Sequence, residues 1–291
     1  MKEKNSEKVI YYSRMEKGYP DKLRQYENMP SGIYVKGKLP DSRMPAVAIV
    51  GARKCSGYGR MQADSFARAF AASHVAVISG MAMGIDSAAH QGALRQGGET
   101  YAVFGCGADI CYPASNRALY AEILQKGGVI TEYPPRTAPL SWHFPARNRI
   151  ISALADAVLV IEAKEKSGSL ITADFALEQG KPVYALPGRV GDALSEGCNR
   201  LIAQGAGIAL SPAVILEELQ LQMTAGTLEE SEMLEADEHI ILNLLQEKAD
   251  GLYGIQTRSG FPVSKLTGIL MKLQLKGFIY EQGKIFNIRK K

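Results

Sequence analysis

The chain has 291 residues, of which 46% are hydrophobic and 22% charged, a composition typical of a folded globular protein. Disordered and collagen-like chains are excluded, and the length predicts one large domain with a small one. The 34 basic and 30 acidic residues leave a net charge of +4, too small for a protein whose whole surface binds nucleic acid. Any anion-binding site must therefore be local.

The amino-terminal residues are polar and charged, without the apolar core of a signal peptide, and no stretch holds the ~18 apolar residues of a membrane span. We therefore expect a cytoplasmic protein with no membrane contact. The four cysteines are widely spaced and include no C-x-x-C pair, and the four histidines lie far apart. These spacings predict no disulfide and no metal site, and no cofactor is expected.

Residues 1–40 have too little periodicity to form a domain and are predicted to be an amino-terminal arm. The predicted main domain covers residues 41–220, where apolar runs alternate with stretches of helical pattern. Most runs are apolar on both faces, which is typical of parallel strands covered by helices on both sides. We therefore predict an extended, Rossmann-like, doubly wound and mainly parallel sheet. Its strands are expected at 46–51, 75–80, 100–107, 128–133, 157–163 and 181–188.

In such sheets ligands bind beyond the carboxyl ends of the strands. After the first run comes GARKCSGYGR, in which Gly51 and Ala52 offer backbone N–H groups and Arg53 a guanidinium. With the start of the following helix, this loop suits a phosphate. It matches neither G-x-G-x-x-G nor G-x-x-x-x-G-K-[ST], so dinucleotide binding and ATP hydrolysis are disfavoured. The alternative is a glycine turn that serves only a tight connection.

The next two runs end in similar glycine-containing turns. Gly80 and Gly84 follow the second run, and Asp86 is expected to cap N–H groups at the start of a helix rather than to act in catalysis. The third run ends in Gly105 and Cys106, too little on its own to identify a dinucleotide site. Further along, Arg117 lies one turn into a helix that is expected to face the same edge of the sheet.

The most specific segment is WHFPARNR, just before the fifth run. Arg147, Asn148 and Arg149 supply phosphate donors at a predicted helix start, and Phe144 supplies a ring on which a base can stack. A solvated basic turn beside a core phenylalanine is the alternative.

The loop after the fifth run carries Ser167, Gly168 and Ser169, whose hydroxyl and N–H groups suit a phosphate at the start of another helix. Simple helix capping is the alternative here.

Residues suited to anion binding thus follow several of the predicted strands, but no set of catalytic residues is found among them. No serine lies in G-x-S-x-G, and no histidine neighbours a nucleophile. The acidic residues Glu132, Asp156 and Glu162 lack metal-site spacing. Binding, rather than turnover, is predicted.

Residues 211–234 carry five acidic and no basic residues, which indicates an acidic linker at 221–236. The remaining 237–291 are expected to form three helices and a hairpin turning at 282–283, the outline of a winged helix. Its third helix bears Lys265, Lys272 and Lys276, which suits duplex DNA. A protein-docking domain with solvated lysines is an equal alternative, because the excess of positive charge in this segment is small.

Taken together, several segments resemble the DprA (Smf) family, the DNA-processing proteins of bacterial natural transformation. They are GARKCSGYG, SGMAMGIDSAAHQGAL, FGCGADICYPASN, the long stretch from FPARNRIISALADAVLVIEAKEKSGSLITADF to KPVYALPG, and GCNRLIAQGA. The resemblance covers residues 45–210 in order. Many members also carry an amino-terminal SAM-like helical domain, which is not expected in this chain.

The resemblance implies a protein that binds and protects single-stranded DNA and loads the RecA recombinase during transformation or homologous recombination. It implies a homodimer and, in some members, contact with the single-strand binding protein SSB; it implies no enzyme activity. The residues implied for the DNA groove are Gly51, Ala52, Arg53, Gly80, Gly84, Gly105, Cys106, Phe144, Arg147, Asn148, Arg149, Ser167, Gly168 and Ser169. Those implied for the dimer are Asn199, Ile202 and Ile208, with RecA on an overlapping face.

One rival reading is an enzyme, a LOG-like nucleoside-monophosphate phosphoribohydrolase on a related Rossmann fold. Such proteins carry P-G-G-x-G-T-x-x-E, whose place is taken here by KSGSLITAD. Without the closing glutamate, hydrolysis lacks its acid-base group. Binding is therefore the favoured reading.

Overall fold

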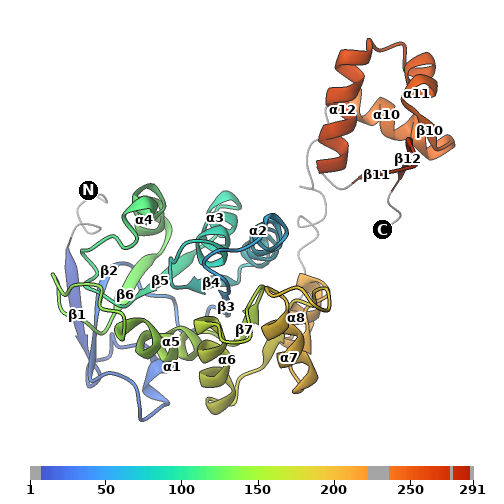
Figure 1. The fold of residues 1–291 in the computed structure, drawn as a ribbon. Coiled ribbons are helices and arrows are strands. Elements are labelled where there is room, and N and C mark those ends of the chain that lie inside the picture. Colours follow the sequence, from blue (N-terminus) through green and yellow to red (C-terminus); the bar gives the residue numbers. More distant parts are fainter. Residues whose placement is uncertain (1–7, 222–235, 276–277, 289–291) are drawn as a thin grey trace. The chain divides into compact units, whose positions relative to one another are not determined.

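A computed structural model describes residues 8–221, 236–275 and 278–288 of the chain (Figure 1). The chain divides into two compact units, residues 1–224 (unit 1) and 225–291 (unit 2). Among the described residues, no helix is long and apolar enough to cross a membrane. The predicted linker falls almost wholly on residues 222–235, which lie outside the described ranges.

The described residues of unit 1 form a nine-stranded sheet with the strand order β1-β2-β6-β5-β4-β3-β7-β8-β9. Neighbouring strands from β6 to β9 pair in parallel, whereas β1 pairs with β2, and β2 with β6, in antiparallel fashion. The predicted α/β fold with a mostly parallel sheet is confirmed. The strands are β1 (Val9–Ser13), β2 (Gly32–Gly37), β3 (Ala46–Val50), β4 (Ala76–Ser79), β5 (Thr100–Phe104), β6 (Gly128–Thr131), β7 (Ala157–Val160), β8 (Val183–Ala185) and β9 (Gly207–Ile208).

Helices cover both faces of this sheet, because its central strands are apolar on both sides. In β3, for example, Val47 and Ile49 pack against one helical layer, and Ala46, Ala48 and Val50 pack against the other. One layer contains α2 (Gly57–Ala72), α3 (Ile85–Arg95), α4 (Arg117–Lys126) and α8 (Pro212–Glu218). The other contains α1 (Asp21–Arg24), α5 (His143–Leu154), α6 (Gly168–Glu178) and α7 (Glu196–Ala203).

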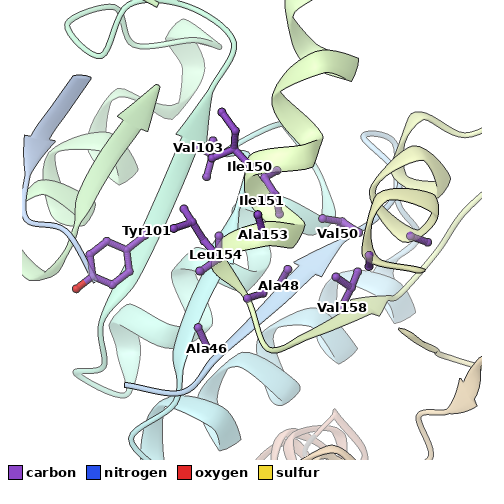
Figure 2. Close-up of a cluster of buried hydrophobic side chains, with 14 of the residues drawn as sticks. Ala46, Ala48, Val50, Tyr101, Val103, Ile150, Ile151, Ala153, Leu154 and Val158 are labelled. Carbon is purple, nitrogen blue, oxygen red and sulfur yellow. The ribbon is translucent and has the colours of Figure 1, made fainter. Parts of the chain in front are cut away.

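Helix α5 lies at the centre of the second layer. Figure 2 shows its Ile150 and Leu154 among the sheet residues Ala48, Val103 and Val158, all of them buried. Small side chains on the strands let the helix approach closely, so its apolar face is removed from water. Burial of one such isoleucine or leucine contributes about 1.5–3 kcal/mol.

The expected arm, residues 1–40, is instead part of unit 1 over its described residues 9–37, which add two strands to the main sheet. They supply β1, α1 and β2, and they place Tyr19, Leu23 and Ile33 in the same core as α5. The Arg14 guanidinium holds the intervening loop by donating to backbone carbonyls, among them that of Tyr26 at 2.8 Å. Two short edge strands joined by an irregular loop have no sustained period, so this pairing was not predicted from the sequence.

The described residues of unit 2 form three helices and a small antiparallel sheet of order β10-β12-β11. Its core includes Ile241, Ile255, Leu266, Leu270 and Phe286. The expected hairpin turns one residue later than predicted, at 283–284, and β10 was not predicted. The elements are α10 (Ala236–Glu247), β10 (Asp250–Gly251), α11 (Leu252–Ser259), α12 (Val263–Leu275), β11 (Ile279–Gln282) and β12 (Ile285–Ile288).

A fully buried histidine links α3 to β5. His90 Nδ1 lies 2.7 Å from Thr100 Oγ1, and that hydroxyl donates to the Val77 carbonyl at 2.8 Å. The threonine hydrogen is thereby used, so Nδ1 donates and Nε2 is the unprotonated nitrogen. Burial lowers the pKa of His90 to about 3, and the charge of Arg147 acts in the same direction.

Acid should therefore destabilise unit 1 through His90. Between the ordinary histidine pKa of 6.5 and the folded value of about 3, the unfolded chain binds a proton that the folded chain does not. Stability present above pH 6.5 is thus lost as the pH falls, by about 1.4 kcal/mol per pH unit. In urea unfolding across this range, His90→Asn should flatten the pH dependence, because its amide can replace the Nδ1 donor without titrating.

The control is His74→Asn, because His74 is exposed and has a positive φ of 57° that asparagine tolerates. It should leave the pH dependence unchanged. An unaltered slope in folded His90→Asn would contradict the assignment.

Candidate anion pocket at the strand ends

A pocket of about 300 Å³ opens at the carboxyl ends of β3 and β7, near the lower limit for ligand sites. These strands are neighbours, but the chain leaves β3 toward β4 on one side and reaches β7 on the other. The pocket therefore lies at the topological switch point, where ligands bind in doubly wound sheets. It is lined by Val50, Gly51, Arg53, Ala82, Asp86, Ser141, Phe144, Pro145, Arg147, Asn148, Ile151, Ser167, Gly168, Ser169 and Thr172.

The start of α6 forms one wall of the pocket. Ser167 is the N-cap, and its hydroxyl accepts from the N–H of Ser169 at 3.4 Å and lies 2.8 Å from the Ser169 hydroxyl. At Gly168 an added Cβ would meet nothing within 4 Å, so the backbone is open to the pocket there. A helix start that faces a cavity presents positive potential and N–H donors to an anion.

Arg147 carries a buried positive charge beneath the pocket. Its Nη1 donates to the carbonyl of Gly80 at 3.1 Å and to that of Val103, and its Nε donates to Asn148 Oδ1 at 3.2 Å. Burial lowers the pKa of Arg147 to about 10, and Asp86 opposes that shift, so the guanidinium is charged at neutral pH. Asn148 in turn donates to the Gly168 carbonyl at 3.1 Å, which joins α5 to the start of α6.

Arg53 supplies the second positive charge and is exposed at the pocket rim. Its guanidinium carbon lies 5.6 Å from the centre of the Phe144 ring, within the range of a cation–π contact. Gly84 allows the Arg53 loop to approach α3, because an added Cβ there would lie 2.3 Å from the Ala52 carbonyl oxygen. Gly84 also has a positive φ of 84°.

Asp86 is the carboxylate of the pocket, and its Oδ2 accepts from the N–H groups of Gly80 at 3.2 Å and Ala82 at 3.3 Å. The expectation that Asp86 caps the start of α3 is wrong: both donors lie in the turn between β4 and the helix, and the helix start at Gly84 has no side-chain cap. Burial raises the pKa of Asp86, whereas the Arg147 charge and the two peptide donors lower it.

The start of α2, by contrast, does not face the pocket as an open anion site. Glu162 covers it: one carboxylate oxygen accepts from the Ser56 N–H at 2.9 Å, and the other accepts from the Ser56 hydroxyl. At Gly59 an added Cβ would lie 2.3 Å from the Glu162 carboxyl carbon. The expectation that this helix start holds a phosphate is wrong, because a carboxylate from the end of β7 already occupies it.

Several other predicted site residues lie outside the pocket lining. Gly80 and Gly105 support it from behind, since they contact Arg147 and Phe144 respectively. Cys106 is buried, and burial raises the pKa of its thiol to about 11. Ala52 and Arg117 are outside the lining, and Arg117 is exposed on α4.

Arg149 is also directed elsewhere. Its two terminal nitrogens donate to Glu132 at 3.0 and 2.7 Å, in a bidentate pair. The side chains of Arg149 and Glu132 are only 17% and 16% exposed. Arg149 follows Arg147 by two positions, and since each helix residue turns the direction by about 100°, the two side chains point about 200° apart. Only one of the two can therefore face the strand ends.

Sequence reasoning missed Tyr112 next to the pocket, and in the lining it missed Val50, Ala82, Ser141, Pro145, Ile151 and Thr172. Tyr112 belongs to the YPASN segment after β5, and its ring centre lies 5.4 Å from that of Phe144. An exposed aromatic in a loop after a strand was the available signal.

A second hollow of about 440 Å³ shares Ser167 and Gly168 with the pocket. Lys166 and Arg200 line it, and Arg200 makes an exposed ion pair with Glu165 at 3.4 Å. Asp174, at the position of the missing glutamate of the hydrolase motif, lines this hollow and is exposed. Two basic and two acidic side chains thus line this hollow, since Glu165 also belongs to it.

The residues expected in a dimer contact have different surroundings. The Asn199 amide is used within the chain, where it donates to the Gly188 carbonyl and accepts from the Gly188 N–H, both at 3.1 Å. Ile202 is half-buried against the core. Ile208 is 46% exposed on the edge strand β9.

Comparison with known proteins agrees with this architecture. The sequence model of the family described as DNA recombination-mediator protein A matches residues 10–220. DNA processing protein DprA of Streptococcus pneumoniae (strain ATCC BAA-255 / R6) is 41% identical over 217 residues, covering 75% of this chain and 77% of that protein. Protein Smf of Escherichia coli (strain K12) is 38% identical over 270 residues, covering 90% of this chain and 72% of that protein.

Two solved structures share the fold. The X-ray structure of DprA from Streptococcus pneumoniae has a TM-score of 0.69 at 39% identity, over 76% of this chain and 77% of its own. DprA from Helicobacter pylori, whose structure is described for its single-stranded DNA binding mode, has a TM-score of 0.64 at 30% identity, over 72% and 95%.

The fold and the pocket define a doubly wound α/β protein with positive charge at its switch point. The extent of these matches places it further: the chain belongs to the DNA recombination-mediator protein A family, whose members are named DprA or Smf.

The two pocket arginines should differ in their effect on stability. Arg147→Ala removes a buried cation that satisfies two strand-end carbonyls, so the free energy of unfolding should fall by about 2–4 kcal/mol. Arg53→Ala removes an exposed side chain and should change it by less than about 0.5 kcal/mol. Urea unfolding of both variants at neutral pH measures this difference; equal losses would contradict a framework role for Arg147.

Proposed function

We propose that this protein binds single-stranded DNA at the switch-point pocket, protects the strand and loads RecA onto it in the cytoplasm, during natural transformation or homologous recombination. The observation that carries the proposal is the convergence of Arg53, Arg147 and the start of α6 on one pocket. Membership in the recombination-mediator family and the similarity to the Helicobacter pylori DprA described for its DNA binding support it.

A phosphodiester fits the chemistry of this pocket. Single strands are bound through a positive groove along the backbone and through aromatic stacking, with weak dependence on sequence and strong dependence on salt. Arg53 and Arg147 provide positive charge at the pocket, although the net charge of the whole chain is only +4. In the second hollow, Lys166 would be the phosphate contact for the next part of the strand, because Arg200 is paired with Glu165.

We infer that the protein acts by binding and not as an enzyme. Among the described residues, those that line the pocket include no histidine or cysteine, and the Asp86 carboxylate accepts two peptide N–H groups. The rival hydrolase reading is weakened further, because Asp174 lies on the second hollow and not on the pocket. An acid-base group must reach the reacting bond.

We also propose a homodimer that includes the edge of the sheet at β9, with RecA on an overlapping face and SSB as a further partner. Exposed Ile208 (46%) and Leu210 (74%) support an apolar contact at this edge. Ile202 would support the contact from the core side, and Asn199 by holding the Gly188 loop. Two linked grooves raise avidity when one strand reaches both.

For unit 2 we propose a winged helix that docks protein rather than duplex DNA. Lys265 of α12, one of the expected DNA contacts, makes an ion pair with Asp237 at 2.7 Å and lies 4.4 Å from the Phe261 ring centre. On the same helix Val263 (45%) and Met271 (63%) are exposed apolar residues. Lys276 lies outside the described residues.

The DNA-binding proposal is tested by Arg53→Ala. This variant should weaken binding of a labelled single strand by about ten-fold or more, since a charge-assisted contact contributes about 1.5–3 kcal/mol. The slope of affinity against salt should also become shallower. Fluorescence anisotropy across a salt series, with matched duplex as competitor, measures both effects, and RecA assembly on an SSB-coated strand should slow in parallel.

The matched control is Arg43→Ala. It removes the same charge from the amino-terminal side of β3, away from the pocket at the carboxyl end, and the Arg43 side chain is 89% exposed. It should bind single strands as the unaltered protein does. An equal effect of the two substitutions, or full affinity of folded Arg53→Ala, would contradict the assignment of the pocket.

The dimer proposal is tested by Ile208→Arg. A charge in an apolar contact cannot be desolvated cheaply, so the dimer should dissociate at concentrations where the unaltered protein stays paired. Sedimentation velocity measures the shift. Tyr11→Arg is the control, because Tyr11 is 47% exposed on β1, the opposite edge strand. Dissociation in both variants, or in neither, would argue against β9 as the contact.

A further inference from the structure

An aromatic row extends from the pocket over its rim. The Phe144 ring lies 5.6 Å from the Arg53 guanidinium carbon and 5.4 Å from the Tyr112 ring centre, with an angle of 30° between the two rings. Phe144 is half-buried by these neighbours and by the strand end, where an added Cβ on Gly105 would lie 3.0 Å from its ring. Tyr112 is 41% exposed, so the accessible aromatic surface of the row belongs to Tyr112.

The loop that carries Tyr112 is held at the pocket. Asn116 Nδ2 donates to the Met81 carbonyl at 2.9 Å and to the Ser87 hydroxyl at 2.8 Å. Met81 is buried and directly precedes Ala82, which lines the pocket. These bonds attach the loop after β5 to the turn between β4 and α3. Tyr112 is thereby kept next to a site for phosphate.

We propose that Tyr112 is a base-stacking residue, whose ring receives a nucleobase of the strand that places its phosphate in the pocket. Phe144 acts as the support behind Tyr112. This inference rests on the proposed single-strand binding. It assigns to Tyr112 the base-stacking contact that the sequence assigned to Phe144. An exposed ring beside a cation site suits a base, because each base offers a π-face joined by its sugar to a phosphate.

Stacking on Tyr112 has a chemical signature that distinguishes it from phosphate binding. The contact needs the base but not its hydrogen-bonding edge, so it should tolerate any sequence. It needs the phenyl ring but not the hydroxyl, so phenylalanine should replace tyrosine. A strand of the same length and charge with all bases removed keeps the phosphate contacts and loses this one.

The experiment compares a thymidine strand with an abasic strand of equal length, by anisotropy at one salt concentration, for the full chain. The unaltered protein should bind the thymidine strand about ten-fold more tightly, because the abasic strand has no base to stack on the ring. Tyr112→Ala should lose about ten-fold for the thymidine strand and nothing for the abasic one. Tyr112→Phe should retain affinity for both.

Tyr11→Ala is the matched control, because Tyr11 is also an exposed tyrosine (47%) packed on an aromatic ring, with 4.9 Å between its ring centre and that of Tyr34. It should change neither affinity. A loss by Tyr112→Ala for both strands would mean that the loop was distorted, and would overturn the stacking assignment. Equal binding of both strands by the unaltered protein would also overturn it while leaving the phosphate pocket intact. Binding of neither strand would instead contradict the proposed function.

Discussion

The buried guanidinium of Arg147 is the interaction on which the pocket depends. It enters from α5 and bonds to the carbonyl groups at the ends of β4 and β5, while Asn148 beside it bonds to the first residue of α6. A buried cation without partners would be too costly, so the strand ends, the helix and the charge must form together. The pocket is therefore built before any ligand arrives, which reduces the ordering cost of binding.

The positive character of the pocket also depends on where the carboxylates go. Glu132 is paired with Arg149, Glu162 covers the start of α2, and Asp86 is bonded to two peptide N–H groups. Each of these three acidic groups is thus engaged by a donor of the chain itself. Arg53 and the start of α6 are left facing the pocket, so a chain of modest net charge has a local concentration of positive charge there.

The two edges of the main sheet differ in the length of the edge strand and in the side chains that it exposes. At one edge, β1 and β2 add an antiparallel pair onto the last parallel strand, and their intervening loop buries Tyr19 and Leu23. At the other, β9 is two residues long and exposes Ile208. Short edge strands limit unwanted pairing between sheets, and an exposed apolar side chain there favours a contact through side chains. This asymmetry supports the choice of β9 for the dimer proposal.

The sequence by itself determined the parallel sheet and the chemistry at its strand ends. Continuous apolar runs can be satisfied only between two helical layers, and glycines, serines and arginines follow those runs directly. What only the tertiary structure decided is which of these residues meet. The antiparallel strands β1 and β2 depend on core contacts such as those of Tyr19 and Ile33, because their own hydrophobic pattern is too short to specify them. Arg147 and Arg149 are two residues apart, yet one supports the pocket and the other pairs with Glu132. Glu162 closes α2 from a position over 100 residues away, and Tyr112 reaches Phe144 from another loop. Such contacts depend on side-chain direction and on long-range packing, which local sequence does not encode.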